Sequence, residues 1–207
     1  MTNDKNAKLN ARIKTIFEDS ARVKNAIAND QNAIETLRNM ADISAKSIKN
    51  GGKIMLCGNG GSAGDAQHIT AELLVRLRPD CTRAALPAIT LAMDTSTITA
   101  CSNDFSYEQI FERPLRALSK PGDVLIGIST SGNSKNVIQA MKAAIELGVV
   151  VIGFLGKDGG PALEHCDHVF IPTGTTDTGR IQESHITAGH ALVEMIEENL
   201  GMGKISV

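Results

Sequence analysis

The sequence predicts an α/β protein in which helices cover both faces of a parallel sheet. Short, uniformly apolar runs at 53–57, 88–92, 123–128 and 149–155 alternate with helical stretches, and a weaker run lies at 167–171. Uniformly apolar strands separated by helices are typical of a parallel sheet that is buried on both faces. The 207 residues, of which 42% are hydrophobic and 21% charged, suffice for one globular domain.

Two helices are expected before the first strand. Apolar residues recur at helical spacing over 8–30 and again over 31–50, where a glycine pair ends the pattern. We expect residues 1–50 to form a helical hairpin that packs on the main domain and in an oligomer interface. Residues 51–200 are expected to form that domain, so that the protein is single-domain overall. Its helices are expected over 62–77, 95–118, 134–148 and 180–200.

The composition argues against several classes of partner. Lys and Arg number 21 against 23 Asp and Glu, for a net charge of −2, so the basic surface that binds a nucleic-acid backbone is missing. One Tyr, five Phe and no Trp leave little for base stacking. The sequence has no signal-peptide core, no run of about eighteen apolar residues and no CxxC pair. We therefore expect a cytoplasmic protein with reduced thiols that binds neither nucleic acid nor membrane.

The first strand runs into a glycine loop, residues 58–62, that opens a helix. Glycines let backbone N–H groups approach a ligand closely, and the helix N-terminus adds a partial positive charge. The spacing from Gly58 to Ala63 also permits a dinucleotide fingerprint with Asp94 on the ribose. That alternative is weaker, because Asp94 lies more than 30 residues further along the chain and the fingerprint places its acidic residue after about 20.

The third strand runs into a hydroxyl loop, residues 129–134, with the sequence Ser-Thr-Ser-Gly-Asn-Ser. Four hydroxyl groups and a glycine at a strand-to-helix turn can surround a phosphate with hydrogen-bond donors. The alternative, a helix N-cap, explains only the hydroxyl of Ser134. Because the loop contains no Lys or Arg, the sequence predicts a site for a small phosphate ester that is held by neutral donors.

His68 and Glu72 lie four residues apart on the helix that follows the glycine loop, so their side chains share one face. They can present an imidazole and a carboxylate to one metal ion or one substrate, although a plain surface contact is the alternative. His185 and His190 lie on the last helix, which follows the last loop of the sheet. Three of the five histidines therefore lie on two helices that are expected to adjoin the rim at which parallel sheets bind ligands.

Five ordered motifs together resemble the sugar isomerase (SIS) domain family, and within it the bacterial phosphoheptose isomerases, over about residues 30–200. The motifs are Gly58-Asn-Gly-Gly-Ser62, Asn103-Asp-Phe105, Ser129-Thr-Ser-Gly-Asn-Ser134, Gly156-Lys-Asp-Gly-Gly160 and Arg180-Ile-Gln-Glu183. The resemblance implies a three-layer α/β/α sandwich, assembled as a homotetramer with active sites at subunit interfaces. It also implies the conversion of sedoheptulose 7-phosphate to D-glycero-D-manno-heptose 7-phosphate through an enediol, the first step toward nucleotide-activated heptose for lipopolysaccharide.

The resemblance also assigns residues to the site. One zinc ion per subunit would be held by His68, Glu72, Gln182 and His190, with Glu72 as the base and His190 as the acid of the isomerisation. Arg76, one turn beyond Glu72, is a further candidate for substrate binding. The other implied substrate contacts, besides Glu72 and Gln182, are Asn59, Gly60, Gly61, Ser62, Asn103, Asp104, Ser129, Thr130, Ser131 and Ser134.

One position departs from the family pattern. The family has an Asp directly before its Arg-Ile-Gln, whereas this sequence has Gly179, so Asp177 or Thr178 is expected to take that role. The leading alternative function is a non-catalytic SIS-domain protein that associates with the replication initiator or senses a sugar phosphate, because such proteins share the two loops. The presence of Glu72 and His190 favours the enzyme.

Overall fold

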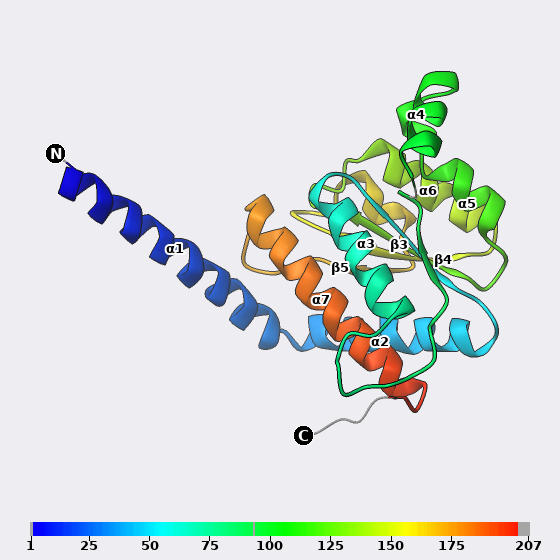
Figure 1. Cartoon of the computed structure of the whole chain (residues 1–207), viewed down its shortest axis with the longest axis horizontal. Helices are drawn as coiled ribbons and strands as arrows, with labels where there is room; N and C mark the ends of the chain where they lie inside the picture. Colours follow the sequence, from blue (N-terminus) through cyan, green and yellow to red (C-terminus); the bar gives the residue numbers. More distant parts are fainter. Residues whose placement is uncertain (1, 93, 203–207) are drawn as a thin grey trace.

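The computed structural model describes residues 2–92 and 94–202 and contains a five-stranded parallel sheet between two layers of helices (Figure 1). The strands are β1 (Ile54–Gly58), β2 (Ala88–Thr90), β3 (Val124–Ser129), β4 (Val150–Leu155) and β5 (His168–Phe170). They lie in the order β2-β1-β3-β4-β5, and every neighbouring pair is parallel. The predicted α/β/α sandwich and all five predicted strands are confirmed.

Side chains of each strand alternate between two hydrophobic clusters. On β1, Ile54 and Leu56 pack with one helical layer, whereas Met55 and Cys57 pack with the other. The first layer consists of α2 (Gln31–Lys49), α3 (Gly61–Leu74) and α7 (Thr178–Asn199). The second consists of α4 (Thr95–Asp104), α5 (Glu112–Leu118) and α6 (Lys135–Glu146). Burial of the sheet on both faces explains why its strands are uniformly apolar.

The prediction of one continuous helix over 95–118 is wrong. The structure has α4, a short 3-10 helix over Tyr107–Gln109, and then α5. Residues with poor helix propensity end α4, and the backbone at Ser106 is fully extended, with φ −163° and ψ 159°. The break turns Ile110 and Phe111 into the core beneath the sheet, where both are buried. Tertiary packing therefore overrides the helical pattern of this segment.

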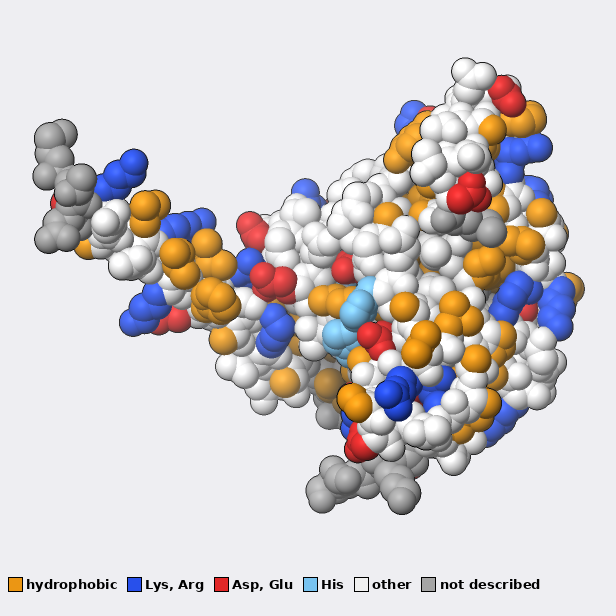
Figure 2. Space-filling view, in the orientation of Figure 1, with side chains coloured by type: hydrophobic (Ala, Val, Ile, Leu, Met, Phe, Trp, Pro, Cys, Tyr) orange, Lys and Arg blue, Asp and Glu red, His pale blue; other side chains and the backbone are white. Residues whose placement is uncertain are grey.

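The two N-terminal helices differ in how they contact the domain. α1 (Thr2–Ala28) projects from the body, whereas α2 packs within the first helical layer (Figure 1). Asp30 starts α2 as its N-cap, since its carboxylate accepts the N–H of Ala33 at 3.1 Å. The projecting part of α1 exposes four large apolar side chains, which form a stripe in Figure 2: Leu9, Ile13, Ile16 and Phe17. Among the residues described, no helix combines the length and apolarity of a bilayer span.

Candidate active site

The glycine loop and the hydroxyl loop lie side by side at the carboxyl edge of the sheet. β1 pairs with β3 so that Gly58 lies opposite Ile128, and β2 flanks β1 on its other side. The strand order therefore reverses between β1 and β3. Such a switch point opens a crevice between the two loops, and parallel α/β proteins bind their ligands there.

The glycine loop turns too tightly for larger residues. A Cβ atom at position 58 would lie 2.7 Å from the carbonyl oxygen of Ser62, and Gly60 has a φ of +55° as the N-cap of α3. The side chain of Asn59 is bound within the protein. Its Nδ2 donates to Oδ1 of Asn136 at 2.8 Å, while its own Oδ1 accepts from Nδ2 of Asn136 at 2.8 Å and from the Tyr107 hydroxyl at 2.9 Å. Asn136 and Tyr107 are not among the predicted site residues, because neither belongs to a recognisable sequence motif.

The hydroxyl groups of the hydroxyl loop do not cap the helix that follows it, α6. Ser134 occupies the N-cap position of α6, but its side chain makes no capping hydrogen bond. Instead, the hydroxyl of Ser129 donates to that of Ser134 at 3.1 Å, and the hydroxyl of Ser131 accepts the N–H of Asn133 at 3.2 Å. The capping alternative therefore does not account for this cluster of hydroxyls, which stays at the N-terminus of α6 beside the crevice.

A glycine clasp, formed by Gly132, Gly159 and Gly160, supports the hydroxyl loop from the loop after β4. The carbonyl oxygen of Gly132 accepts the N–H of Ala162 at 3.0 Å. A Cβ atom at position 132 would lie 1.9 Å from the carbonyl oxygen of Gly159, and one at position 160 would lie 2.9 Å from that of Ser131. The Gly156–Gly160 motif thus has a structural role, because it lets two loops pack backbone against backbone.

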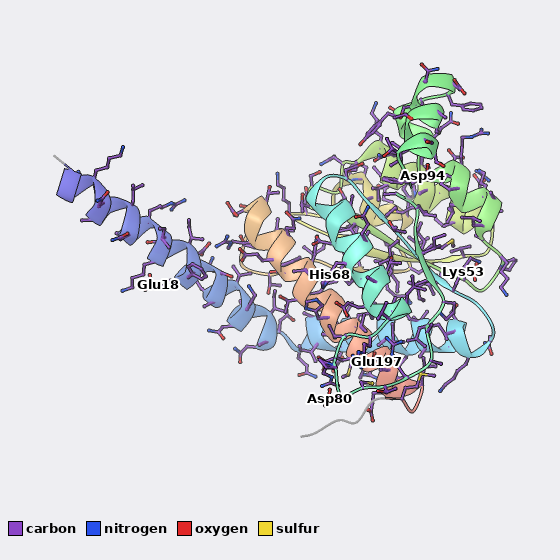
Figure 3. The ribbon with its side chains drawn as sticks, viewed as in Figure 1. Glu18, Lys53, His68, Asp80, Asp94 and Glu197 are labelled. Carbon is purple, nitrogen blue, oxygen red and sulfur yellow. The ribbon has the colours of Figure 1, made fainter. Side chains whose placement is uncertain are left out.

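Three of the predicted site residues meet where α3 and α7 cross. The Nε2 atoms of His68 and His190 are 2.8 Å apart, and His68 Nε2 lies 3.4 Å from a carboxylate oxygen of Glu72. Close packing next to the two rings brings the helices together, since a Cβ atom at Gly189 would lie 2.4 Å from the side chain of Ile69. Figure 3 shows His68 on the side of α3 that faces α7, and Figure 2 shows histidine rings at the surface beside an acidic side chain.

Gln182 lies further toward the start of α7, beside the first turns of α3. Its amide packs on Gly61, where a Cβ atom would lie 1.9 Å from Nε2 of Gln182. It also contacts Asp65, which is 8% exposed and whose Oδ2 atom has no hydrogen-bond partner. Burial raises the pKa of Asp65, while a hydrogen bond with Gln182 and the charge of His68 act in the opposite direction. Asp65 is not among the predicted site residues, although its spacing of three residues from His68 places both on one face of α3.

The donor set of this cluster fits a zinc ion, whereas the distances are those of a hydrogen-bonded pair. Two imidazoles and a carboxylate are ligands that zinc prefers. Nitrogens bound to one tetrahedral zinc would be about 3.3 Å apart, so the two rings would need to separate by about half an ångström to bind one. In the described part of the chain, no three His, Cys, Asp or Glu side chains are arranged as a ready metal site.

Other predicted site residues lie outside this cluster. Arg76 follows the end of α3 and donates to the carbonyl oxygen of Pro79 at 2.8 Å. Asn103 and Asp104 form the exposed last turn of α4, where the amide of Asn103 donates to the carboxylate of Asp104 at 2.8 Å. The structure of one chain does not join these three residues to the histidine pair by any hydrogen bond that the described residues make.

Asp177 lies at the start of the last helix, and His185 lies on its buried face. Asp177 is the N-cap of α7 and accepts the N–H of Arg180 at 3.0 Å, so one of its oxygens is used to start the helix that Thr178 opens. His185 lies on the predicted helix, but its side chain packs in the core and not at the surface of the site. His185 is fully buried between Phe154 and Phe170, with Nε2 2.7 Å from the carbonyl oxygen of Leu155. It faces the sheet because it lies five residues before His190, which is not a same-face spacing on a helix.

Known proteins share the pattern of this chain over most of its length. The SIS domain pattern matches residues 17–156. A phosphoheptose isomerase of Clostridium acetobutylicum is 47% identical over 91% of this chain and 94% of its own length, and one of Aquifex aeolicus is 48% identical over 90% and 95%. The solved structure of a phosphoheptose isomerase from Neisseria gonorrhoeae superposes with a TM-score of 0.84 at 39% identity, covering 92% of this chain and 99% of that one. The chain therefore belongs to the phosphoheptose isomerases of the SIS domain family.

Proposed function

We propose that the protein is an aldose–ketose isomerase that converts sedoheptulose 7-phosphate to D-glycero-D-manno-heptose 7-phosphate. The observation that carries this proposal is the meeting of His68, Glu72 and His190 beside the glycine and hydroxyl loops. Isomerisation requires a base for a carbon-bound proton and an acid for oxygen, and this cluster supplies a carboxylate and two imidazoles. Relatives that share about half of its residues are named phosphoheptose isomerases, which supports the same reaction here.

In the proposed mechanism, Glu72 and His190 move protons on the two carbons that exchange the carbonyl group. Glu72 removes a proton from C1 of the ketose, and His190 donates a proton to the C2 oxygen, which gives the cis-enediol. His190 then removes the proton of the C1 hydroxyl while Glu72 returns a proton to C2, which yields the aldehyde. The carboxylate of Glu72 is 17% exposed, so the base acts where little water competes.

We propose that the phosphate of the substrate lies in the crevice between the glycine loop and the hydroxyl loop. Its donors would be Ser62 of the glycine loop and the hydroxyls of Ser129, Thr130, Ser131 and Ser134, together with the backbone N–H groups of both loops. The phosphate group is remote from the reacting carbons, so its binding contributes by orienting the sugar. Such orientation can lower the activation barrier by several kcal/mol. In this proposal the backbone of Asn59, Gly60 and Gly61 contacts the substrate.

A zinc ion is the proposed cofactor, and His68, Glu72, Gln182 and His190 would hold it. When bound, zinc polarises a carbonyl group as a Lewis acid. The protein residues supply the proton transfers. Arg76, Asn103 and Asp104 are proposed substrate contacts that would complete the site from neighbouring subunits of a homotetramer, since no hydrogen bond among the described residues joins them to the histidine pair within one chain.

The wider role follows from the reaction. The product is an aldose phosphate of seven carbons, and we propose that it enters nucleotide-activated heptose synthesis for lipopolysaccharide in the cytoplasm. The proposed division of the chain into an N-terminal helical part, residues 1–50, and an isomerase domain, residues 51–200, assigns the first part to oligomer contacts. The exposed apolar stripe on α1 supports that assignment.

The direct test is turnover of sedoheptulose 7-phosphate by the purified protein, with and without added zinc, followed by proton NMR of the heptose anomers. Glu72→Gln and His190→Ala are expected to abolish turnover while circular dichroism shows an intact fold. The absence of turnover by the unaltered protein under both conditions, together with tight binding of the sugar phosphate, would favour the non-catalytic binding protein. Chelation followed by metal analysis checks the zinc proposal separately.

A further inference from the structure

We propose that Arg83 is a positioning residue for the reaction, because it fixes the last turn of α3, and Glu72 within it, against α7. This inference rests on the proposed isomerase function. Arg83 belongs to the loop between α3 and β2, for which the sequence suggests no role. Its guanidinium group is 1% exposed and forms an ion pair with the carboxylate of Glu197, which is 0% exposed. Arg and Glu side chains are almost never fully buried unless they are paired, and loss of one partner leaves an uncompensated buried charge.

The guanidinium group of Arg83 caps the C-terminal end of α3. Its Nη2 atom donates to the carbonyl oxygen of Glu72 at 2.7 Å, and its Nη1 atom donates to that of Leu73 at 2.9 Å. The last four carbonyl groups of a helix have no partner within the helix and are stabilised by donors and positive charge. The same Nη1 atom also reaches the carbonyl oxygen of Ala84 at 3.0 Å. Arg83 therefore supplies the partner that the carbonyl oxygen of Glu72 lacks within the helix, and a second donor to that of Leu73, which also accepts the N–H of Leu86 at 3.0 Å.

The position of the proposed base depends on this cap. Glu72 is the third residue from the end of α3, in the turn that frays first when its carbonyl groups lose their partners. Its carboxylate lies 3.4 Å from His68 Nε2, and His68 is one turn closer to the start of the helix. Loosening of the last turn would therefore move Glu72 relative to the histidine pair while His68 stays in place.

Glu197 connects Arg83 to the second helix of the site, α7. Figure 3 shows Glu197 on α7, two turns beyond His190. Its carboxylate accepts from Nε of Arg83. Arg83 thus joins the backbone of the residue that supplies the base to the helix that supplies the acid. The other carboxylate oxygen of Glu197, Oε2, has no partner, so the bond from Arg83 to Oε1 is the only hydrogen bond that this carboxylate makes among the described residues.

The test variant is Arg83→Lys, which keeps a positive charge for Glu197 but cannot reach both carbonyl oxygens. We expect kcat to fall about 10- to 100-fold, as for a misplacement of a catalytic group by about 1 Å, with KM for sedoheptulose 7-phosphate changed less than about 3-fold. The matched control is Lys53→Met. Lys53 directly precedes β1 and forms an ion pair with another fully buried carboxylate, that of Asp123. The control is expected to lower the melting temperature and leave kcat unchanged at a temperature at which it is folded.

A second readout does not depend on turnover. Nitrogen NMR of the imidazoles is expected to shift for His68 and His190 in Arg83→Lys, because Glu72 moves relative to them, and to stay unchanged in Lys53→Met. If the unaltered protein does not turn over the substrate, the proposed function fails, but these shifts still decide whether Arg83 positions Glu72. A folded Arg83→Lys protein with kcat within about 2-fold of the original and unshifted imidazoles would overturn the inference.

The double variant Arg83→Met with Glu197→Met guards against a failure to fold, because apolar residues of similar size often replace a buried ion pair without loss of stability. It removes the cap on Glu72 and is expected to show the same loss of kcat. If neither variant folds, or if the double variant folds with full kcat, Arg83 serves stability alone and the inference is wrong.

Discussion

Gly61, the first residue of α3, leaves the space that the amide of Gln182 occupies. A methyl group at position 61 would meet the far end of a flexible side chain, so the amide would move while the backbone stays in place. Gly61→Ala is therefore expected to keep the melting temperature or raise it slightly, since Ala favours a helix over Gly by up to about 1 kcal/mol. Turnover is expected to fall about 10-fold or more, because the proposed zinc ligand and substrate contact is displaced.

Gly64→Ala is the matched control for this prediction. Gly64 lies on the same helix, and a Cβ atom there would meet nothing within 4 Å. Its melting temperature should rise by a similar amount, with turnover unchanged. Parallel thermal unfolding and rate measurements on both variants separate the effect on Gln182 from the effect on the helix. Equal turnover in the two variants would show that the amide of Gln182 does not contribute.

His185 makes the stability of the protein dependent on pH. Burial lowers the pKa of His185 to about 4 from its ordinary value of 6.5, and the hydrogen bond with Leu155 acts weakly in the opposite direction. His185 therefore binds a proton below about pH 6.5 in the unfolded chain, but only below about pH 4 in the folded protein. The contribution of His185 to the free energy of unfolding is greatest above pH 6.5, and it falls by about 3 kcal/mol as the pH drops from about 6.5 to about 4.

Replacement of His185 by Gln removes this titration and keeps a side chain that can donate to Leu155. Urea unfolding at pH 7 and at pH 4.5 should show a smaller loss of stability in the variant than in the original protein, by about 2 kcal/mol. The variant is expected to start from a lower stability at pH 7, because the aromatic contacts with Phe154 and Phe170 are lost. Equal pH dependence in both proteins would contradict the assignment to His185.

At the scale of the elements, the sequence predicts what depends on local chemistry. The uniformly apolar strands, the glycine loop and the hydroxyl loop all occur where the pattern indicates, because each is specified by residues within one segment. What the pattern misses depends on contacts between segments. The break after Asp104 comes from burial of Ile110 and Phe111, and the buried position of His185 comes from the rotation of α7 against the sheet.

The site shows the same division. The spacing of four residues predicts that His68 and Glu72 share a face, and the structure confirms it with a distance of 3.4 Å between them. No local rule connects them to His190, which lies 122 residues from His68, and this link came from the family resemblance. Arg83 and Asn136 act through hydrogen bonds to distant segments, so neither could be recognised before the fold was known.

The glycine clasp allows a prediction about the hydroxyl loop as an element. Gly132 has a φ of +67°, and its Cβ atom would meet the backbone of Gly159. Gly132→Ala therefore forces the two loops apart. Its matched control is Gly122→Ala, where φ is +88° but the space is open.

Both variants lose about 1 to 2 kcal/mol to the left-handed backbone. Gly132→Ala should lose about 1 to 3 kcal/mol more through overpacking and should also raise KM for the sugar phosphate. Chemical unfolding and steady-state kinetics check the two effects. An unchanged KM in Gly132→Ala would argue against phosphate binding by the hydroxyl loop.

For the whole molecule, the projecting α1 is the feature that a single chain does not explain. Its exposed stripe of four large apolar side chains would contribute about 1.5 to 3 kcal/mol per side chain when fully buried. The base of the helix is fixed to α7, because the Ser20 hydroxyl donates to Glu183 at 2.6 Å and Arg180 donates to the carbonyl oxygen of Ile16 at 2.6 Å. A stripe held out in a defined direction is suited to contact another copy of the chain.

Phe17→Glu places a charge in the middle of this stripe, where the side chain is 72% exposed in one chain. We expect the variant to dissociate toward a folded monomer, detected as a lower molar mass by light scattering with unchanged circular dichroism. Thr15→Glu adds the same charge on the opposite side of α1 and should keep the original molar mass. If neighbouring subunits supply Asn103 and Asp104 to each site, the dissociated variant also loses turnover although His68 and His190 remain paired. A monomeric variant with full turnover would instead show that one chain holds the complete site.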